Sequence, residues 1–202
     1  MHRYSVLNIK SNILILFYVI ICVLSIAVTC LINIGISCVI ENSCYIFLQS
    51  IFETVPIIVC FQLFKWLFEK YSLKIPCFCY LVNITNLNGC WKGKLISSYD
   101  HNEYNIQLNI IQTLDRIKIE AIFDNSISNS YMAAIETKQN DNLCYLYFNY
   151  KNNANQNVTW DIRKHDGFNE LVYRNSDKTL TGSYFTNRGS GTSGTIKLEK
   201  IG

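Results

Sequence analysis

A long run without charged side chains near the start of the chain constrains its fold most strongly. Residues 11–40 contain no Asp, Glu, Lys or Arg, and residues 42–64 contain a single charged residue, Glu53. A helix over residues 13–40 is about 42 Å long, which exceeds the roughly 30 Å hydrocarbon core of a bilayer. Because the apolar region of a cleaved signal peptide is shorter, this run predicts a membrane span.

Two spans are predicted. We expect the first helix to end within residues 32–37, where Asn33 and Gly35 weaken it, and a second helix to run over residues 44–68. Residues 41–43 leave room only for a short connection between them. The two spans are therefore expected to form an antiparallel α-hairpin in the membrane.

Basic residues near the span ends predict the orientation. Arg3 and Lys10 precede the first span, whereas Lys65, Lys70 and Lys74 follow the second. The connection between the spans has no Lys or Arg. Because such residues stay in the cytoplasm, we expect a multi-pass protein of the cell membrane with both termini and the polar part inside the cell.

Glu53 and Pro56 are unusual residues for a membrane span. A carboxylate near the middle of a span costs about 2.5–3.5 kcal/mol. Glu53 therefore either helps helices associate or lines a pore, or it lies nearer the interface or is protonated. Pro56 removes one helix hydrogen bond and is expected to kink the second span.

Charge and cysteine usage exclude some partners. The net charge of +3 is not the basic footprint of a protein that binds duplex DNA or RNA. The 9 cysteines are scattered, and Cys77 and Cys79 have no histidine nearby to complete a zinc site. We predict a reducing compartment, no metal and no cofactor.

Beyond residue 83 the composition turns polar and the apolar residues alternate, as in Tyr104, Ile106, Leu108 and Ile110. Period two is typical of strands with one buried face, and turn signals such as Asp166-Gly167 separate eight or nine of them, one near residues 159–164. Closure would remove exposed edges. We predict a membrane α-hairpin plus an all-β part, a small antiparallel up-and-down β-barrel of about eight strands.

The predicted organisation has three parts. They are a two-helix transmembrane region over 1–72, a linker over 73–83, and a cytoplasmic ligand-binding barrel over 84–202. No P-loop, GxGxxG or nucleophile motif occurs, so enzyme activity is not expected. The interpretation from the residues alone stays open between a barrel that binds a ligand and one filled by its own side chains.

Several short motifs carry a resemblance to a known family. They are Leu87-x-Gly89-x-Trp91-x-Gly93, His165-x-Gly167, Leu180-x-Gly182-x-Tyr184-Phe185-Thr186-x-Arg188, and Gly191-Thr192-x-Gly194 before Ile196-x-Leu198. With two spans before them, they resemble the effectors with two transmembrane helices and a β-strand-rich, minimal β-barrel domain from bacterial cyclic-oligonucleotide-based antiphage signalling systems (CBASS). The resemblance covers essentially the whole chain.

That resemblance implies a function. A partner nucleotidyltransferase makes a cyclic nucleotide, expected to be a cyclic dinucleotide, and the barrel binds it. The barrel then self-associates, the clustered spans disrupt the inner membrane of the bacterium, and the infected cell dies.

Cyclic dinucleotide chemistry suggests roles for five residues. Tyr184 and Trp91 would stack on a base, and Arg188 would pair with a phosphate. Thr186 and Thr192 would donate hydrogen bonds. Each residue also has a structural interpretation: Trp91 as a core plug, Tyr184 as a core residue and Arg188 as a solvated turn residue.

Two other functions remain open at this point. One is a membrane-tethered, lipocalin-like barrel that holds an apolar small molecule in a lumen lined by residues such as Tyr145, Tyr147, Ile106 and Leu108. The other is a scaffold with a filled barrel and no ligand.

Overall fold

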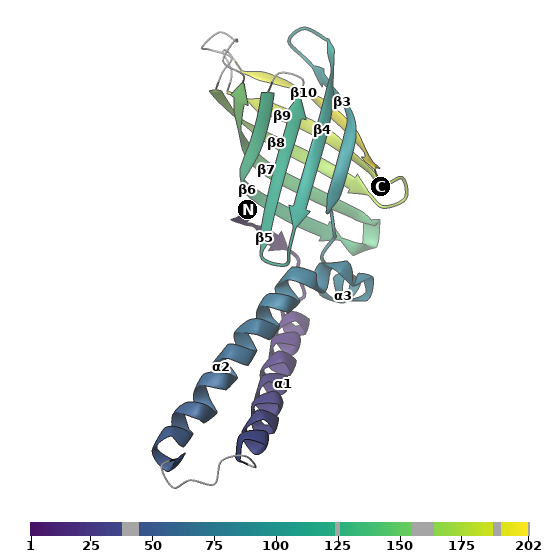
Figure 1. The fold of residues 1–202 in the computed structure, drawn as a ribbon. Coiled ribbons are helices and arrows are strands. Elements are labelled where there is room, and N and C mark those ends of the chain that lie inside the picture. Colours follow the sequence, from purple (N-terminus) through teal and green to yellow (C-terminus); the bar gives the residue numbers. More distant parts are fainter. Residues whose placement is uncertain (38–44, 124–125, 155–163, 188–190, 202) are drawn as a thin grey trace. The chain divides into compact units, whose positions relative to one another are not determined.

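The computed structural model describes residues 1–37, 45–123, 126–154, 164–187 and 191–201. The chain divides into two compact units. A helical unit comprises residues 10–82, and a barrel unit comprises residues 1–9 together with residues 83–202 (Figure 1). The sequence analysis assigned the first nine residues to the transmembrane region, whereas here they hydrogen-bond to strands of the barrel.

Two long helices dominate the helical unit. Its elements are α1 (Ser11–Ser37), α2 (Tyr45–Tyr71), the 3-10 turn η1 (Ser72–Lys74) and the short helix α3 (Pro76–Val82). Both predicted helices are therefore present, and α1 ends where Asn33 and Gly35 were expected to weaken it. The predicted connection over residues 41–43 lies outside the described residues.

Along α1, a narrow stripe is buried while the surrounding apolar surface is exposed. Ile21, Ser25 and Thr29, spaced four residues apart, are buried, whereas residues such as Leu16 and Val23 are more than half exposed. The Ser25 hydroxyl donates to the carbonyl of Ile21 at 2.7 Å, and Thr29 donates to the carbonyl of Ser25 at 2.9 Å. A helix that is apolar all round and keeps its hydroxyls bonded to its own backbone suits a lipid environment.

By length and composition, α1 could cross a membrane over residues 11–35, and among the described residues it alone meets that test. A signal sequence near the N-terminus has the same properties. The role of α2 as a second span therefore stays a proposal.

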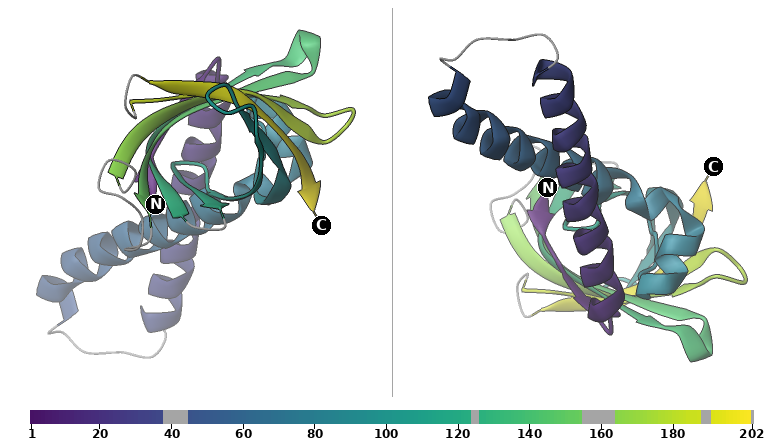
Figure 2. Two further views of the ribbon diagram at one scale, coloured as in Figure 1. Left: turned by 90° about the horizontal axis from the view of Figure 1, so that it is seen from above. Right: turned by 90° about the horizontal axis from the view of Figure 1, so that it is seen from below.

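In the described part of the chain, eight strands form a closed antiparallel barrel. They are β3 (Gly89–Ser97), β4 (Glu103–Gln112), β5 (Arg116–Phe123), β6 (Ser126–Lys138), β7 (Leu143–Ala154), β8 (Lys164–Arg174), β9 (Thr179–Thr186) and β10 (Thr192–Ile201). Each strand pairs with its sequence neighbours, and β10 returns to pair with β3. Figure 2 shows the strands end-on as a ring. The predicted up-and-down barrel is confirmed; the predicted strand near residues 159–164 lies largely outside the described residues.

Inward-facing apolar side chains, at every second position of the strands, fill the interior of the barrel. Leu180 and Leu198 are fully buried and Ile106 and Leu108 nearly so, as members of one cluster that all eight strands build. The inward phase over residues 180–186 agrees with the sequence pattern, because Leu180 and Tyr184 are both buried.

The lipocalin-like alternative placed Tyr145 and Tyr147 in the lumen, and this part of it is wrong. On β7 the buried residues are Cys144, Leu146 and Phe148, so the two tyrosines in between point out of the barrel. Their rings stack on each other at 6.2 Å on the outer wall. The sequence shows the period of this strand, but its phase depends on the neighbouring strands.

Two short strands from the N-terminus extend the sheet. β1 (His2–Arg3) pairs antiparallel with β5, and β2 (Ser5–Leu7) pairs parallel with β6. Direct pairing of β5 with β6 covers only Glu120–Phe123 and Ser126–Asn129. The N-terminal segment therefore occupies the place where these two strands are no longer paired with each other.

The buried thiol of Cys144 provides a test of this packing. Burial raises the pKa of Cys144 to about 11, so the thiolate is scarce near neutral pH. We expect Cys144 to resist a short alkylation pulse at pH 8, whereas the exposed Cys77 reacts. Mass-spectrometric mapping before and after unfolding would measure this. Equal modification of the two thiols in the folded chain would contradict the described core.

Candidate functional site

Polar side chains of the inner face gather at one end of the barrel, which we call the polar mouth. This end holds the last residues of β7 and β9 and the first residues of β8 and β10. Its members are Ser128, Tyr150, Asn152, His165, Asn169, Tyr184, Thr186 and Thr192. The opposite end, where the chain enters β3, we call the base.

Two predicted ligand residues meet at the polar mouth. Thr186 of β9 and Thr192 of β10 are directly paired, and their hydroxyl oxygens lie 2.6 Å apart. Both side chains are half-buried. The structure therefore brings together, at the rim, two hydroxyls that can donate and accept.

A second polar group lies on β6, β7 and β8. The hydroxyl of Ser128 donates to Oδ1 of Asn152 at 2.9 Å, and Nδ2 of Asn152 lies 3.4 Å from Nδ1 of His165. His165 thus belongs to a hydrogen-bonded strand end. Ser128 and Asn152 are buried, so the chain orients these amide and imidazole groups firmly.

Two tyrosine rings at the polar mouth lie against glycines of neighbouring strands. A Cβ on Gly167 would come within 2.3 Å of the Tyr150 ring, and a Cβ on Gly194 would come within 2.6 Å of Cε1 of Tyr184. Each glycine therefore makes room for a ring that a side chain would push away. Tyr184 is 6% exposed, so its ring is part of the floor of the polar mouth.

Tyr150 keeps its phenolic proton across the physiological pH range. Burial raises the pKa of Tyr150 well above its usual value, and the nearby Tyr184 raises it further. Its hydroxyl is therefore a neutral donor and acceptor. Asn169, also buried, lines the cavity below and offers an amide to the same space.

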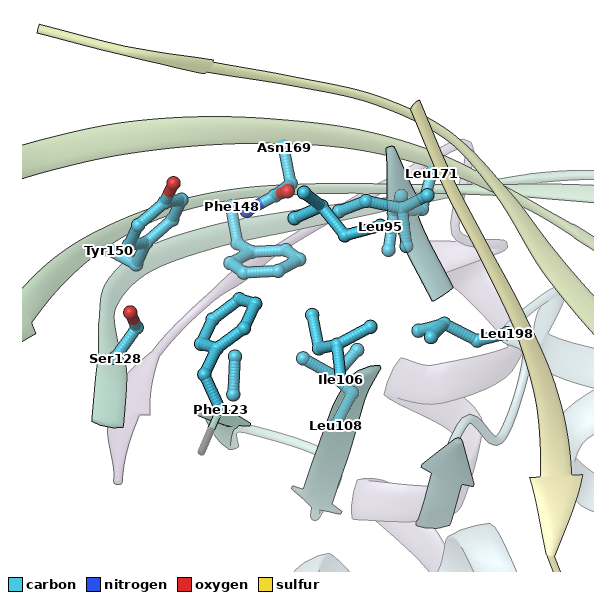
Figure 3. A pocket seen from close by; sticks show the side chains of 12 residues that line it. Leu95, Ile106, Leu108, Phe123, Ser128, Phe148, Tyr150, Asn169, Leu171 and Leu198 are labelled. Atoms are coloured by element: carbon cyan, nitrogen blue, oxygen red, sulfur yellow. The ribbon is translucent and has the colours of Figure 1, made fainter. Parts of the chain in front are cut away.

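A small cavity lies below the polar mouth. It is lined by residues such as Phe148, Tyr150 and Asn169 and has a volume of about 20 Å³. In Figure 3 the rings of Phe123 and Phe148 lie close together, with Ser128 and Tyr150 to one side and aliphatic side chains to the other. This volume suits about one water molecule, far less than a drug-sized pocket.

Trp91 lies at the base, apart from the other predicted ligand residues. It is fully buried, its Nε1 donates to the carbonyl of Leu87 at 3.1 Å, and its ring packs edge-on against Tyr173 at 5.6 Å. Lys200 Nζ lies 5.3 Å from the centre of the same ring. These contacts are those of a plug that closes the base; its predicted stacking role has no support from this geometry.

The remaining predicted residues are Arg188, Glu53 and Pro56. Arg188 lies outside the described residues, between β9 and β10. Glu53 and Pro56 are both in α2, but the side chain of Glu53 is outside what the structure describes. Their predicted roles therefore stay predictions.

Sequence reasoning missed Tyr150, Asn152 and Asn169. Asn152 shares the inward phase of β7 with Phe148, and Asn169 shares that of β8 with Leu171. The available signal was a polar residue at an inward-facing position near a strand end. Its hydrogen-bond partners lie on other strands, so the local pattern did not show them. Among the described residues, no group of three or more His, Cys, Asp or Glu side chains could hold a metal ion.

The polar mouth can bind a ligand through hydrogen-bond donors, acceptors and aromatic rings. Its groups are three aliphatic hydroxyls, two amides, one imidazole and two phenols, all held by the strands. Such a set suits a polar, partly aromatic molecule with several acceptors.

Comparison with known proteins gives one family. Residues 82–200 match the model of the Cap15, cyclic dinucleotide receptor domain, which is more than half of the chain. A search of the curated proteins finds no match.

A substitution at Gly167 tests the position of Tyr150. We expect Gly167→Ala to lower the free energy of unfolding by about 1–3 kcal/mol, because the added methyl overlaps the ring. In a Tyr150→Ala background the same change should cost little, because its obstacle is gone. Denaturant unfolding of the full chain measures both. Equal costs in the two backgrounds would show that the ring does not lie over Gly167.

Proposed function

Because the chain belongs to the Cap15 cyclic dinucleotide receptor domain family, we propose that its barrel binds a cyclic dinucleotide at the polar mouth, self-associates, and disrupts the bacterial inner membrane. Membership of this family supports a CBASS effector that binds a cyclic nucleotide. A partner nucleotidyltransferase would supply the signal. The observation that carries the proposal is the polar mouth above a filled core.

A cyclic dinucleotide offers two phosphates, two flat bases and ribose hydroxyls. The hydroxyls and amides of the polar mouth can bond to the phosphates and the ribose hydroxyls, and the Tyr184 ring provides an aromatic floor for a base. Because the cavity of about 20 Å³ is far too small for this ligand, we place the ligand on the mouth and not in the lumen. The same lack of space disfavours the lipocalin-like alternative with an apolar molecule inside.

Thr186 and Thr192 are the central hydrogen-bonding residues of the proposed site. Their hydroxyls, now 2.6 Å apart, can turn outward together toward one phosphate. Arg188 follows β9 by two residues, so we keep it as the cation that pairs with phosphate.

Thermal unfolding with a panel of cyclic di- and trinucleotides tests the site. Ligand at 100 times its dissociation constant should add about 2.7 kcal/mol of stability, a shift of roughly 5–10 °C for a chain of this size. Thr192→Val should weaken binding by about 10- to 100-fold, since it removes a hydrogen bond to a charged group.

Thr195→Val is the matched control, because Thr195 lies on the same strand but is exposed on the outer face. It should bind like the parent chain, and Arg188→Ala should bind more weakly than the parent. If the folded chain shows no shift with any nucleotide, the receptor proposal fails and a ligand-free scaffold becomes the better account.

We propose that α1 and α2 form a membrane hairpin with both ends in the cytoplasm. Near the end of α2, Lys70 Nζ lies 4.6 Å from the centre of the Trp66 ring, and Lys74 Nζ lies 5.0 Å from that of Tyr71. Aromatic and basic residues together are typical of the cytoplasmic membrane interface. This grouping supports the orientation that the basic residues predict.

Glu53 and Pro56 are proposed to act when several hairpins gather. A carboxylate in a span gains from a polar partner on another helix, and a proline leaves a carbonyl free to accept a bond. Both would favour packing of α2 against neighbouring copies and a breach of the bilayer.

The role of Glu53 can be measured by cell survival after the signal nucleotide is supplied. Glu53→Ala should weaken helix association by about 1–2 kcal/mol, which is roughly 5- to 30-fold in the association constant, and should spare cells accordingly. Glu41→Ala removes the same charge from the predicted connection and serves as the control. Killing by Glu53→Ala at the parent level would exclude this role.

A further inference from the structure

The N-terminal segment, residues 2–7, lies in what we call the seam: the gap between residues 116–117 of β5 and residues 134–136 of β6. His2 and Arg3 pair with Ile117 and Arg116 of β5. Further along, Ser5–Leu7 pair with Ala134–Glu136 of β6. The segment therefore completes the barrel wall by adding a strand to each exposed edge.

Side chains of the N-terminal segment also make specific hydrogen bonds in the seam. His2 Nε2 lies 2.8 Å from the hydroxyl of Ser130, which also accepts from the backbone N–H of Ile119. The Tyr4 hydroxyl donates to the carbonyl of Thr113 at 3.0 Å and accepts from Nε2 of Gln112 at 3.0 Å. The seam thus recognises residues 2–7 by both backbone and side chains.

Two features make the segment easy to release. Arg3 is directly opposite Arg116, and both are exposed, so two like charges face each other across the strand pair, offset in part by Asp115, 3.3 Å from Nε of Arg116. Asn8, just after β2, has a φ of 63°, and α1 begins at Ser11. A short hinge held in a strained conformation favours exchange of the segment it carries.

We propose that the seam is an interaction surface for a second copy of this chain. Residues 2–7 of one copy would occupy the seam of its neighbour, which is a strand exchange. Because the contacts in the exchanged form are the same as those within one chain, the exchange needs no new complementary surface. Tethering to one membrane raises the local concentration of the segments and favours the exchange.

This inference rests on the proposed self-association and names the element that joins the copies. It also links assembly to the span, because the exchanged segment continues within three residues into α1. Copies joined in this way would hold their first helices near one another.

Cross-linking between two differently tagged, full-length copies tests the exchange in membranes. One copy carries Arg3→Cys and the other Arg116→Cys; directly paired strand residues are within disulfide range. Mild oxidation should give a covalent dimer with both tags, increased by the cyclic dinucleotide that raises the melting temperature. The parent pair of tagged copies sets the background from native cysteines.

Three further variants serve as controls for the cross-linking experiment. Arg3→Cys with Arg116→Cys in one chain should give an intrachain link without nucleotide. Arg3→Cys paired with Thr195→Cys, on the exposed face of β10, should give no dimer above background. A Gly-Ser-Gly insertion after Asn8 lengthens the hinge, relieves its strain, and should cause loss of the two-tag dimer.

Each failure has its own meaning. An intrachain link without any two-tag dimer would overturn the exchange, and the receptor function would stand if the nucleotide still raised the melting temperature. Absence of the intrachain link would overturn the placement of the segment in the seam. A two-tag dimer in a chain that no nucleotide stabilises would support the exchange and overturn the proposed receptor function.

Discussion

Eight backbone pairs between β3 and β10 join the first and last strands of the barrel, and most other features of the molecule depend on this closure. A closed sheet has one inner face that all its strands share, so residues from distant parts of the sequence meet there. The same pairing brings backbones very close: a Cβ on Gly93 would be 2.0 Å from the carbonyl oxygen of Lys197. Glycine at such a position allows the strands to bend around a narrow core.

The inner face changes character along the strands. At the base, Trp91 and Leu87 are fully buried, whereas at the polar mouth hydroxyls, amides and an imidazole line the inner face. A rigid apolar plug below a polar rim holds the rim residues in place without exposing the core. The polar side chains and the apolar plug thus lie at opposite ends of the same strands.

Much of this architecture could be predicted from local patterns. Alternating apolar and polar residues predicted the strands and the inward phase of Leu180 and Tyr184. The run without charged side chains predicted α1. The predictions that failed concern features set by distant parts of the chain. The phase of Tyr145 depends on neighbouring strands that a local pattern does not include. Asn152 and Asn169 gain their meaning from cross-strand neighbours. The two-residue strand β1 is too short to show a period, and its partner β5 is more than a hundred residues away in the sequence.

The insertion of the helical unit between residues 9 and 83 has a consequence for how the protein is made. During synthesis the N-terminal segment and both long helices leave the ribosome before β5 and β6 exist. The segment must therefore wait, unpaired, until its two partner strands arrive, while α1 and α2 have already been synthesised. Contacts of such long sequence separation form late and slowly. The residues that were synthesised first thus complete a part of the barrel wall whose partner strands are synthesised more than a hundred residues later.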